Sequence, residues 1–97
     1  MPQFDVHRFD GGYVVDCQSD NLEAFTSRVV VPLVPSEAFR LKFPRLTPAF
    51  VVGGREFVLA THLVAAVDRQ SLGPVVASLS SERYAVQTAI DLLTGSY

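Results

Sequence analysis

Residues 80–95 read SSERYAVQTAIDLLTG and carry the clearest structural signal in the sequence. Apolar residues in this stretch recur at i, i+3, i+4 and i+7, which places them on one face of an α-helix. Ser80 is expected to cap the free backbone N–H groups, with Leu79 packing on Tyr84, and Gly95 is expected to end the helix. The apolar face consists of Val86, Ala89, Ile90 and Leu93.

The chain before this helix is expected to form short strands. Apolar runs at residues 4–9 and 13–18 flank Asp10-Gly11-Gly12, and Gly53-Gly54 joins the runs 49–52 and 55–60. Both glycine pairs predict hairpins, because glycine tolerates the positive φ of tight turns.

A further strand is predicted from Arg28 to Val34. Pro32 inside it indicates an edge position or a bulge, since proline cannot donate a ladder hydrogen bond. A helical turn capped by Ser36 is expected near residues 36–40, and residues 73–79 resemble a strand. Residues 61–67 are compatible with either a strand or a helical turn.

About five or six strands followed by one helix, without βαβ alternation, predict an α+β fold that is mostly β. We expect a small antiparallel sheet or partly open barrel of about five strands with a C-terminal helix. The length of 97 residues, with a mass of 10.6 kDa, fits one domain over residues 1–97.

Composition excludes several classes of protein. Apolar residues make up 48% of the chain and charged residues 19%, which is too little charge for a disordered chain. The pI near 5.5 and net charge of −2 lack the basic footprint of a nucleic-acid binder, so direct DNA binding is not expected. The single cysteine, Cys17, and the lack of a membrane-spanning run or signal peptide indicate a cytoplasmic protein with no membrane contact.

Charge is unevenly distributed along the chain. Residues 36–69 hold five bases against three acids, whereas residues 1–35 hold five acids against two bases. This asymmetry either steers a partner weakly or reflects charges spaced along solvated loops. The five bases are Arg40, Lys42, Arg45, Arg55 and Arg69.

The residues suited to catalysis form no recognisable set. Cys17 is either a nucleophile beside His7 on the neighbouring strand or a small buried apolar residue. Asp16 and Asp20 pair as acid and base only if their loop folds back. His62 lies far from His7 in the sequence, and no metal-ligand spacing occurs. We therefore expect no catalytic residue, metal or cofactor, and a binding protein in preference to an enzyme.

Five blocks of the sequence together resemble the CcdB family of plasmid-maintenance toxins. The resemblance covers almost the whole chain and implies a homodimer with a small, partly barrel-like sheet and a C-terminal helix. It also implies a toxin that binds the A subunit of DNA gyrase and traps the cleaved DNA complex, until a cognate antitoxin with a disordered C-terminal segment releases it. The blocks are residues 3–6 (QFDV), 15–20 (VDCQSD), 28–33 (RVVVPL), 77–80 (ASLS) and 89–93 (AIDLL).

The resemblance also implies where gyrase would bind. The family ends in Trp-Gly-Ile where this chain has Gly95, Ser96 and Tyr97, and it has Asn where this chain has Asp91. Tyr97 supplies an aromatic ring two positions later than the family's tryptophan. Two alternatives remain: a relative that keeps antitoxin binding but has lost or changed its target, and an unrelated enzyme or small-ligand protein using Cys17, His7 or His62. The implied gyrase-binding residues are Phe4, Asn21, Leu22, Asp91, Gly95, Ser96 and Tyr97.

Overall fold

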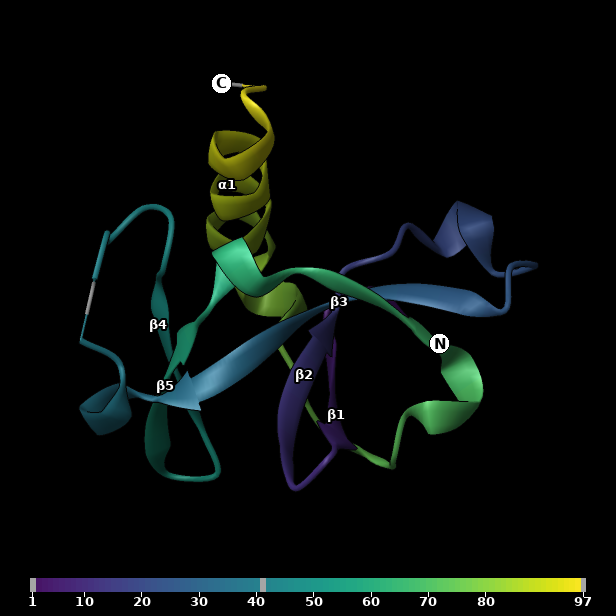
Figure 1. Ribbon diagram of the computed structural model, residues 1–97, viewed down its shortest axis with the longest axis horizontal. Helices are drawn as coiled ribbons and strands as arrows, with labels where there is room; N and C mark the ends of the chain where they lie inside the picture. Colours follow the sequence, from purple (N-terminus) through teal and green to yellow (C-terminus); the bar gives the residue numbers. More distant parts are fainter. Residues whose placement is uncertain (1, 41, 97) are drawn as a thin grey trace.

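The computed structural model describes residues 2–40 and 42–96, which form a curled antiparallel sheet with one long helix standing on it (Figure 1). The mostly β fold with a C-terminal helix is confirmed, with seven described strands instead of about five. Five short 3-10 turns lie in the connections. The elements are β1 (Asp5–Phe9), β2 (Gly12–Asp16), η1 (Asp20–Leu22), β3 (Ser27–Pro35), η2 (Ser36–Ala38), β4 (Ala49–Val52), β5 (Arg55–Leu59), η3 (Thr61–Leu63), β6 (Ala65–Asp68), η4 (Arg69–Ser71), β7 (Val75–Ser78), η5 (Ser80–Glu82) and α1 (Arg83–Thr94).

Both predicted hairpins are present. β1 pairs with β2 around a turn in which Asp10 and Gly11 have φ values of 50° and 80°. β4 pairs with β5 around Gly53 and Gly54, at 60° and 80°. Positive φ at both turn residues matches the right-handed twist of the flanking strands, and glycine occupies three of these four positions because it adopts such a φ without strain.

β3 is an interior strand whose register with β2 runs without a shift through Pro32, so neither the edge position nor the bulge expected from Pro32 is present. The strand order is β4-β5-β3-β2-β1-β7, and β6 also pairs with β3. On the side away from β2, β6 pairs with residues 27–30 and β5 with residues 33–35. Pro32 lies where these two neighbours change over, and its carbonyl accepts a hydrogen bond from the Ala60 N–H at 2.9 Å. The proline is tolerated because no ladder donor is required at this point.

α1 packs against one face of the sheet through the predicted apolar stripe. Val86 and Ala89 are completely buried, Ile90 is partly buried, and Leu93 is 37% exposed near the end of the helix. No helix among residues 2–40 and 42–96 has the length and apolar character to cross a bilayer. The core beneath α1 includes Val6, Val15, Val31, Leu33, Phe57, Leu59 and Leu79.

Two expected helix caps are wrong. Ser80 is the first residue of η5, which leads into α1 after Glu82, and neither of these elements has a side-chain cap. Tyr84 is 84% exposed and therefore makes no staple with buried Leu79. Ser36 likewise begins the turn η2 instead of capping it. In each case a 3-10 turn begins at the serine, where we expected a helix end with free backbone N–H groups for the serine to cap.

The opposite face of the sheet holds a buried ion pair between β2 and β3. Arg28 and Asp16 are both fully buried, and the guanidinium Nε and Nη2 atoms lie 3.0 and 2.8 Å from the Asp16 Oδ2 atom. Glu23 approaches the same guanidinium at 3.7 Å from the partly exposed side. Such a buried pair is stable only when the attraction between the two charges offsets the cost of removing both of them from water.

We expect Arg28→Met to lower the free energy of unfolding by about 3–5 kcal/mol, because it leaves the Asp16 carboxylate buried without its main partner. Urea titration followed by circular dichroism measures this change. In the double variant Asp16→Asn/Arg28→Met, part of the loss should be recovered, because no buried charge remains. A single-variant loss below about 1 kcal/mol, the range of surface pairs, would contradict a structural role for the pair.

Candidate functional site

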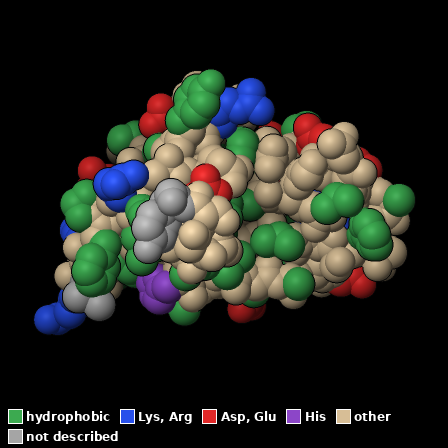
Figure 2. All heavy atoms as spheres, turned by 90° about the horizontal axis from the view of Figure 1, so that it is seen from above, with side chains coloured by type: hydrophobic (Ala, Val, Ile, Leu, Met, Phe, Trp, Pro, Cys, Tyr) green, Lys and Arg blue, Asp and Glu red, His purple; other side chains and the backbone are tan. Residues whose placement is uncertain are grey.

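The turn η1 and the C-terminal part of α1 lie on either side of a cavity of about 330 Å³. We call this surface the target face and define it by its exposed apolar members Leu22, Val29 and Leu93, which are 37–44% exposed. In Figure 2, which looks onto the end of the molecule where α1 finishes, apolar side chains form separate patches. The cavity is lined by Cys17, Gln18, Ser19, Leu22, Val29, Val64, Gln87, Ile90, Leu93 and Thr94.

Gln18 fixes the position of Leu22 on this face. Its backbone N–H donates to Asp16 Oδ1 at 3.1 Å, and its side-chain amide donates to the Leu22 carbonyl at 3.0 Å. Its Oε1 atom accepts from the Val29 N–H, also at 3.0 Å. Sequence reasoning missed this role, because a polar Gln-Ser-Asp stretch has the composition of an ordinary loop. The target face is therefore linked directly to the buried ion pair.

At the helix end, the structure places three of the predicted gyrase-binding residues together. The Asp91 carboxylate accepts from Gln87 Nε2 at 3.1 Å, and its backbone carbonyl accepts from the Ser96 N–H at 2.8 Å. Gly95 ends α1 with a left-handed φ of 84°, and both Gly95 and Ser96 are exposed. Tyr97 lies outside the described residues.

The other predicted gyrase-binding residues do not all lie on one surface. Asn21 is exposed in η1, beside Leu22, and its backbone N–H donates to Ser19 Oγ at 3.2 Å. Phe4 is only 3% exposed and belongs to the core under α1. Its side chain is thus used in packing, and the structure does not place it on the target face.

The structure also does not bring together the residue pairs that we considered for catalysis. His7 faces away from the core that contains Cys17, and its Nδ1 atom lies 3.0 Å from the Gly73 carbonyl oxygen. Asp16 is paired with Arg28, while Asp20 accepts from the Gln3 N–H at 2.8 Å. Within residues 2–40 and 42–96, no group of three metal-ligating side chains is placed to hold an ion.

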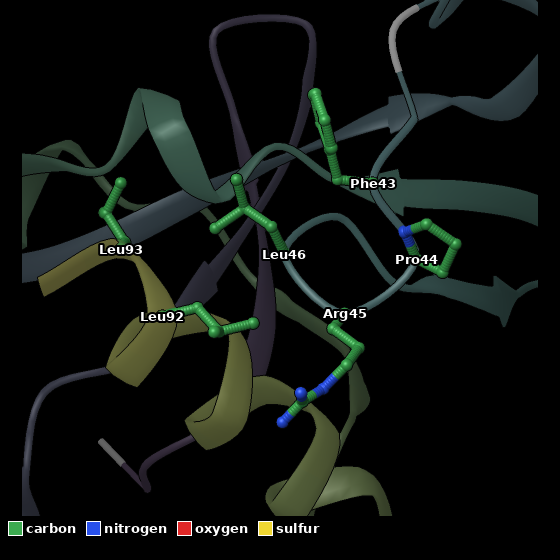
Figure 3. A pocket seen from close by; sticks show the side chains of 6 residues that line it. All are labelled: Phe43, Pro44, Arg45, Leu46, Leu92 and Leu93. Carbon is green, nitrogen blue, oxygen red and sulfur yellow. The ribbon is translucent and has the colours of Figure 1, made fainter. Parts of the chain in front are cut away.

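A second apolar surface lies between the β3–β4 connection and α1, and we call it the loop groove. It is a cavity of about 610 Å³ lined by Phe43, Pro44, Arg45, Leu46, Leu92 and Leu93. In Figure 3, Leu92 points from α1 toward Leu46 and Arg45 of the connection. Leu93 lines both this groove and the target face, so the two surfaces are adjacent.

The sequence matches the CcdB protein family over residues 3–95. The chain belongs to the CcdB family. This match spans all the strands and the helix, and it confirms the resemblance found in the sequence.

Solved structures of toxins share this fold at low sequence identity. A mycobacterial structure described as an endoribonuclease in complex with its cognate antitoxin has a TM-score of 0.79 and 15% identity, and covers 98% of this chain and 96% of its own. The Mycobacterium tuberculosis toxin MazF-mt6 has a TM-score of 0.75 and 13% identity, with 97% of each chain covered. No curated protein matches the chain.

The expectation that the protein is not an enzyme is contradicted by these structures. They place named endoribonucleases on the same fold, so the fold itself supports catalysis. The expectation depended on finding no compact set of catalytic residues in the sequence. Catalytic residues on separate strands and turns can lie far apart in the sequence, because they come together only in the folded sheet.

We expect Cys17 to resist thiol reagents in the folded protein. Burial, and secondarily the Asp16 carboxylate, raises the pKa of the Cys17 thiol from 9.0 to about 12. The thiolate population near pH 7 is then roughly a thousandfold smaller than for a free thiol. Reaction with a disulfide reagent in buffer and in denaturant measures the difference. Equal rates in both would show that the folded protein leaves Cys17 accessible to the reagent, which would contradict this prediction.

Proposed function

We propose that this chain is a toxin that binds the A subunit of DNA gyrase through its target face and traps the cleaved DNA complex. Family membership over residues 3–95 is the observation that carries the proposal. It is supported by the position of Leu22 beside the C-terminal part of α1, because these segments correspond to the gyrase-binding segments implied by the family resemblance. A cognate antitoxin would neutralise the protein, and the cytoplasm, where gyrase acts, would be its location.

The contact would differ from that of relatives ending in Trp-Gly-Ile. Gly95 offers no side chain, so a tryptophan anchor at this position is absent, and such anchors commonly dominate binding. Leu22, Val29 and Leu93 present apolar area instead, and Asp91 adds a negative charge near it. We infer that this distribution favours a target surface with apolar and cationic groups.

We further propose that the protein acts as a homodimer. Leu63 is 52% exposed and Val64 is 38% exposed at the η3–β6 junction, next to the target face. Apolar side chains grouped in this way are typical of surfaces that another molecule covers. A twofold axis at this junction would place two copies of the target face near one another, which suits a twofold-symmetric enzyme such as gyrase.

RNA cleavage is the second candidate function, favoured by the endoribonucleases that share the fold. His62 is exposed and its ring lies 5.7 Å from the Phe39 ring, whereas His7 is buried. An exposed imidazole can act as a general base toward a ribose hydroxyl near neutral pH. In this candidate mechanism, His62 would abstract the 2′-hydroxyl proton of a strand stacked on Phe39, and the 2′-oxygen would bond to the adjacent phosphorus as the P–O5′ bond breaks. The departing 5′-oxygen would take a proton from water, and the other product would carry a 2′,3′-cyclic phosphate.

We expect the purified protein to trap linear plasmid DNA with gyrase from its own source. Leu22→Asp should reduce the trapped DNA about tenfold or more, because it places a charge in an apolar contact. Val51→Asp is the matched control, since Val51 is 69% exposed on β4 and does not line the target face. Agarose gels after protease treatment measure the linear product.

Two results would contradict the gyrase proposal. One is the absence of linear DNA at every toxin concentration, and the other is an equal effect of the two aspartate variants. If the protein instead cleaves single-stranded RNA, and His62→Ala abolishes the cleavage while leaving the melting temperature unchanged, the second candidate replaces the first.

The dimer proposal predicts a particle of twice the 10.6 kDa chain mass in light scattering after gel filtration. Leu63→Asp should convert it to a monomer, because the charge would be buried against the second copy. Val76→Asp is the control, as Val76 is 40% exposed on β7, outside this junction. A wild-type particle of single mass would refute the proposed dimer.

A further inference from the structure

The strand β7 forms one edge of the sheet. Among the described strands it comes last in the order β4-β5-β3-β2-β1-β7, with β1 on its inner side. On a strand that is paired along one side, every second residue directs its backbone N–H and C=O groups outward. The outer side of β7 therefore offers backbone groups to which a further strand can be added.

The side chains of β7 are exposed on both faces of the sheet. Successive residues of a strand point to opposite faces, yet Val75 is 52% exposed and Val76 is 40% exposed. Pro74, directly before the strand, is exposed as well. In β4, at the other end of the strand order, exposed and buried residues alternate, so one face is already packed. An added strand would thus cover apolar surface on two faces of β7 but on only one face of β4.

The stretch around β7 carries no charge. No charged residue occurs between Arg69 and Glu82, although edge strands usually carry charges that keep other chains from pairing with them. Each flank of the stretch has one acid and one base, Asp68 with Arg69 and Glu82 with Arg83. Like charges that oppose one another across two strands destabilise their pairing. A second copy of β7 meets no such opposition, because the strand is uncharged and its flanks are neutral.

We propose that β7 pairs in antiparallel orientation with β7 of a second copy of this chain, so that the sheet continues from one protomer into the other. Pairing of a strand with its own copy is related by a twofold axis and closes after two copies. It would cover Val75 and Val76 and satisfy the outward backbone groups. The strand has only four residues, so we expect a weak contact that forms as the protein concentration rises.

This contact is separate from the surfaces described above. No residue of β7 lines the cavity of the target face or the loop groove. Leu63 and Val64, which carry the proposed homodimer, lie at the start of β6, and β6 pairs with β3, whereas β7 pairs with β1. The β7 contact therefore goes beyond the proposed function and does not depend on gyrase, on RNA or on the first dimer.

The test measures the mass of the full-length Leu63→Asp variant by light scattering over a series of protein concentrations. We expect 10.6 kDa at low concentration and twice that mass at high concentration. Adding Val76→Asp should raise the concentration needed for association about tenfold or more, because it brings two carboxylates together across the twofold axis. Val51→Asp on β4 is the matched control, and it should change that concentration less than about twofold.

Hydrogen exchange gives a second measurement that reports on the backbone. Amides of residues 75–78 should exchange more slowly at high concentration than at low concentration, because pairing protects the outward N–H groups. The same comparison in the Val76→Asp form should show no added protection. Thermal melts of all variants verify that each one is folded.

Three results would overturn the proposal. They are a mass that stays constant over the whole series, an equal effect of Val51→Asp and Val76→Asp, and growth beyond twice the low-concentration mass, which indicates head-to-tail association. A constant mass, together with slower exchange at residues 75–78 only when an uncharged valine-rich peptide is added, would replace the second copy by an extended segment of another protein. If wild-type protein at low concentration has a single mass, the first dimer is refuted while the result for β7 stands.

Discussion

The buried ion pair between Asp16 and Arg28 is the constraint on which both the sheet and the target face depend. Two charges with no exposed area are costly unless each meets the other and further hydrogen bonds satisfy the remaining polar atoms. The free carboxylate oxygen of Asp16 meets this requirement by accepting the Gln18 N–H. Gln18 in turn accepts from Val29 and donates to Leu22, so the pair determines where the loop after β2 runs.

The central strand β3 changes its pairing partner on one side, and the sheet curls around it beside the target face and the loop groove. Residues 30–33 of this strand pair with β2 on one side, and residues 27–30 and 33–35 pair with β6 and β5 on the other. β6 and β5 diverge at Pro32, and the chain between them turns through η3. The last turns of α1 project beyond the sheet (Figure 1), where the helix borders one cavity with η1 and another with the β3–β4 connection.

The sequence correctly predicted those elements that depend only on residues close together in the chain. The glycine turns and the apolar stripe of α1 follow from backbone freedom and helical periodicity, and both are present in the fold. The position of Pro32 was predicted wrongly, because a proline is tolerated in a central strand when its neighbours change there, and pairing partners are not a local property. Ser80 was predicted wrongly as a cap because a 3-10 turn preceded the helix.

The candidate site was less predictable because it is made by tertiary contacts. Leu22 resembles an ordinary loop residue until Gln18 and the end of α1 are placed beside it. Arg28 resembles a solvated charge in an otherwise apolar strand, and only the fold shows that it is buried. The loop groove went unrecognised because its apolar residues are split between a proline-rich connection and the helix, which lie far apart in the sequence.

The end of α1 decides how any partner can be recognised. Gly95 has a left-handed φ, and the N–H groups of Gly95 and Ser96 both donate to the Asp91 carbonyl, while the Thr94 hydroxyl donates to the Ile90 carbonyl at 3.0 Å. Backbone groups at this end are thus satisfied internally, and a larger residue at position 95 would be strained by the positive φ. Side chains along the helix flank, where Leu93 borders both surfaces, are therefore the groups that this part of α1 offers to a partner.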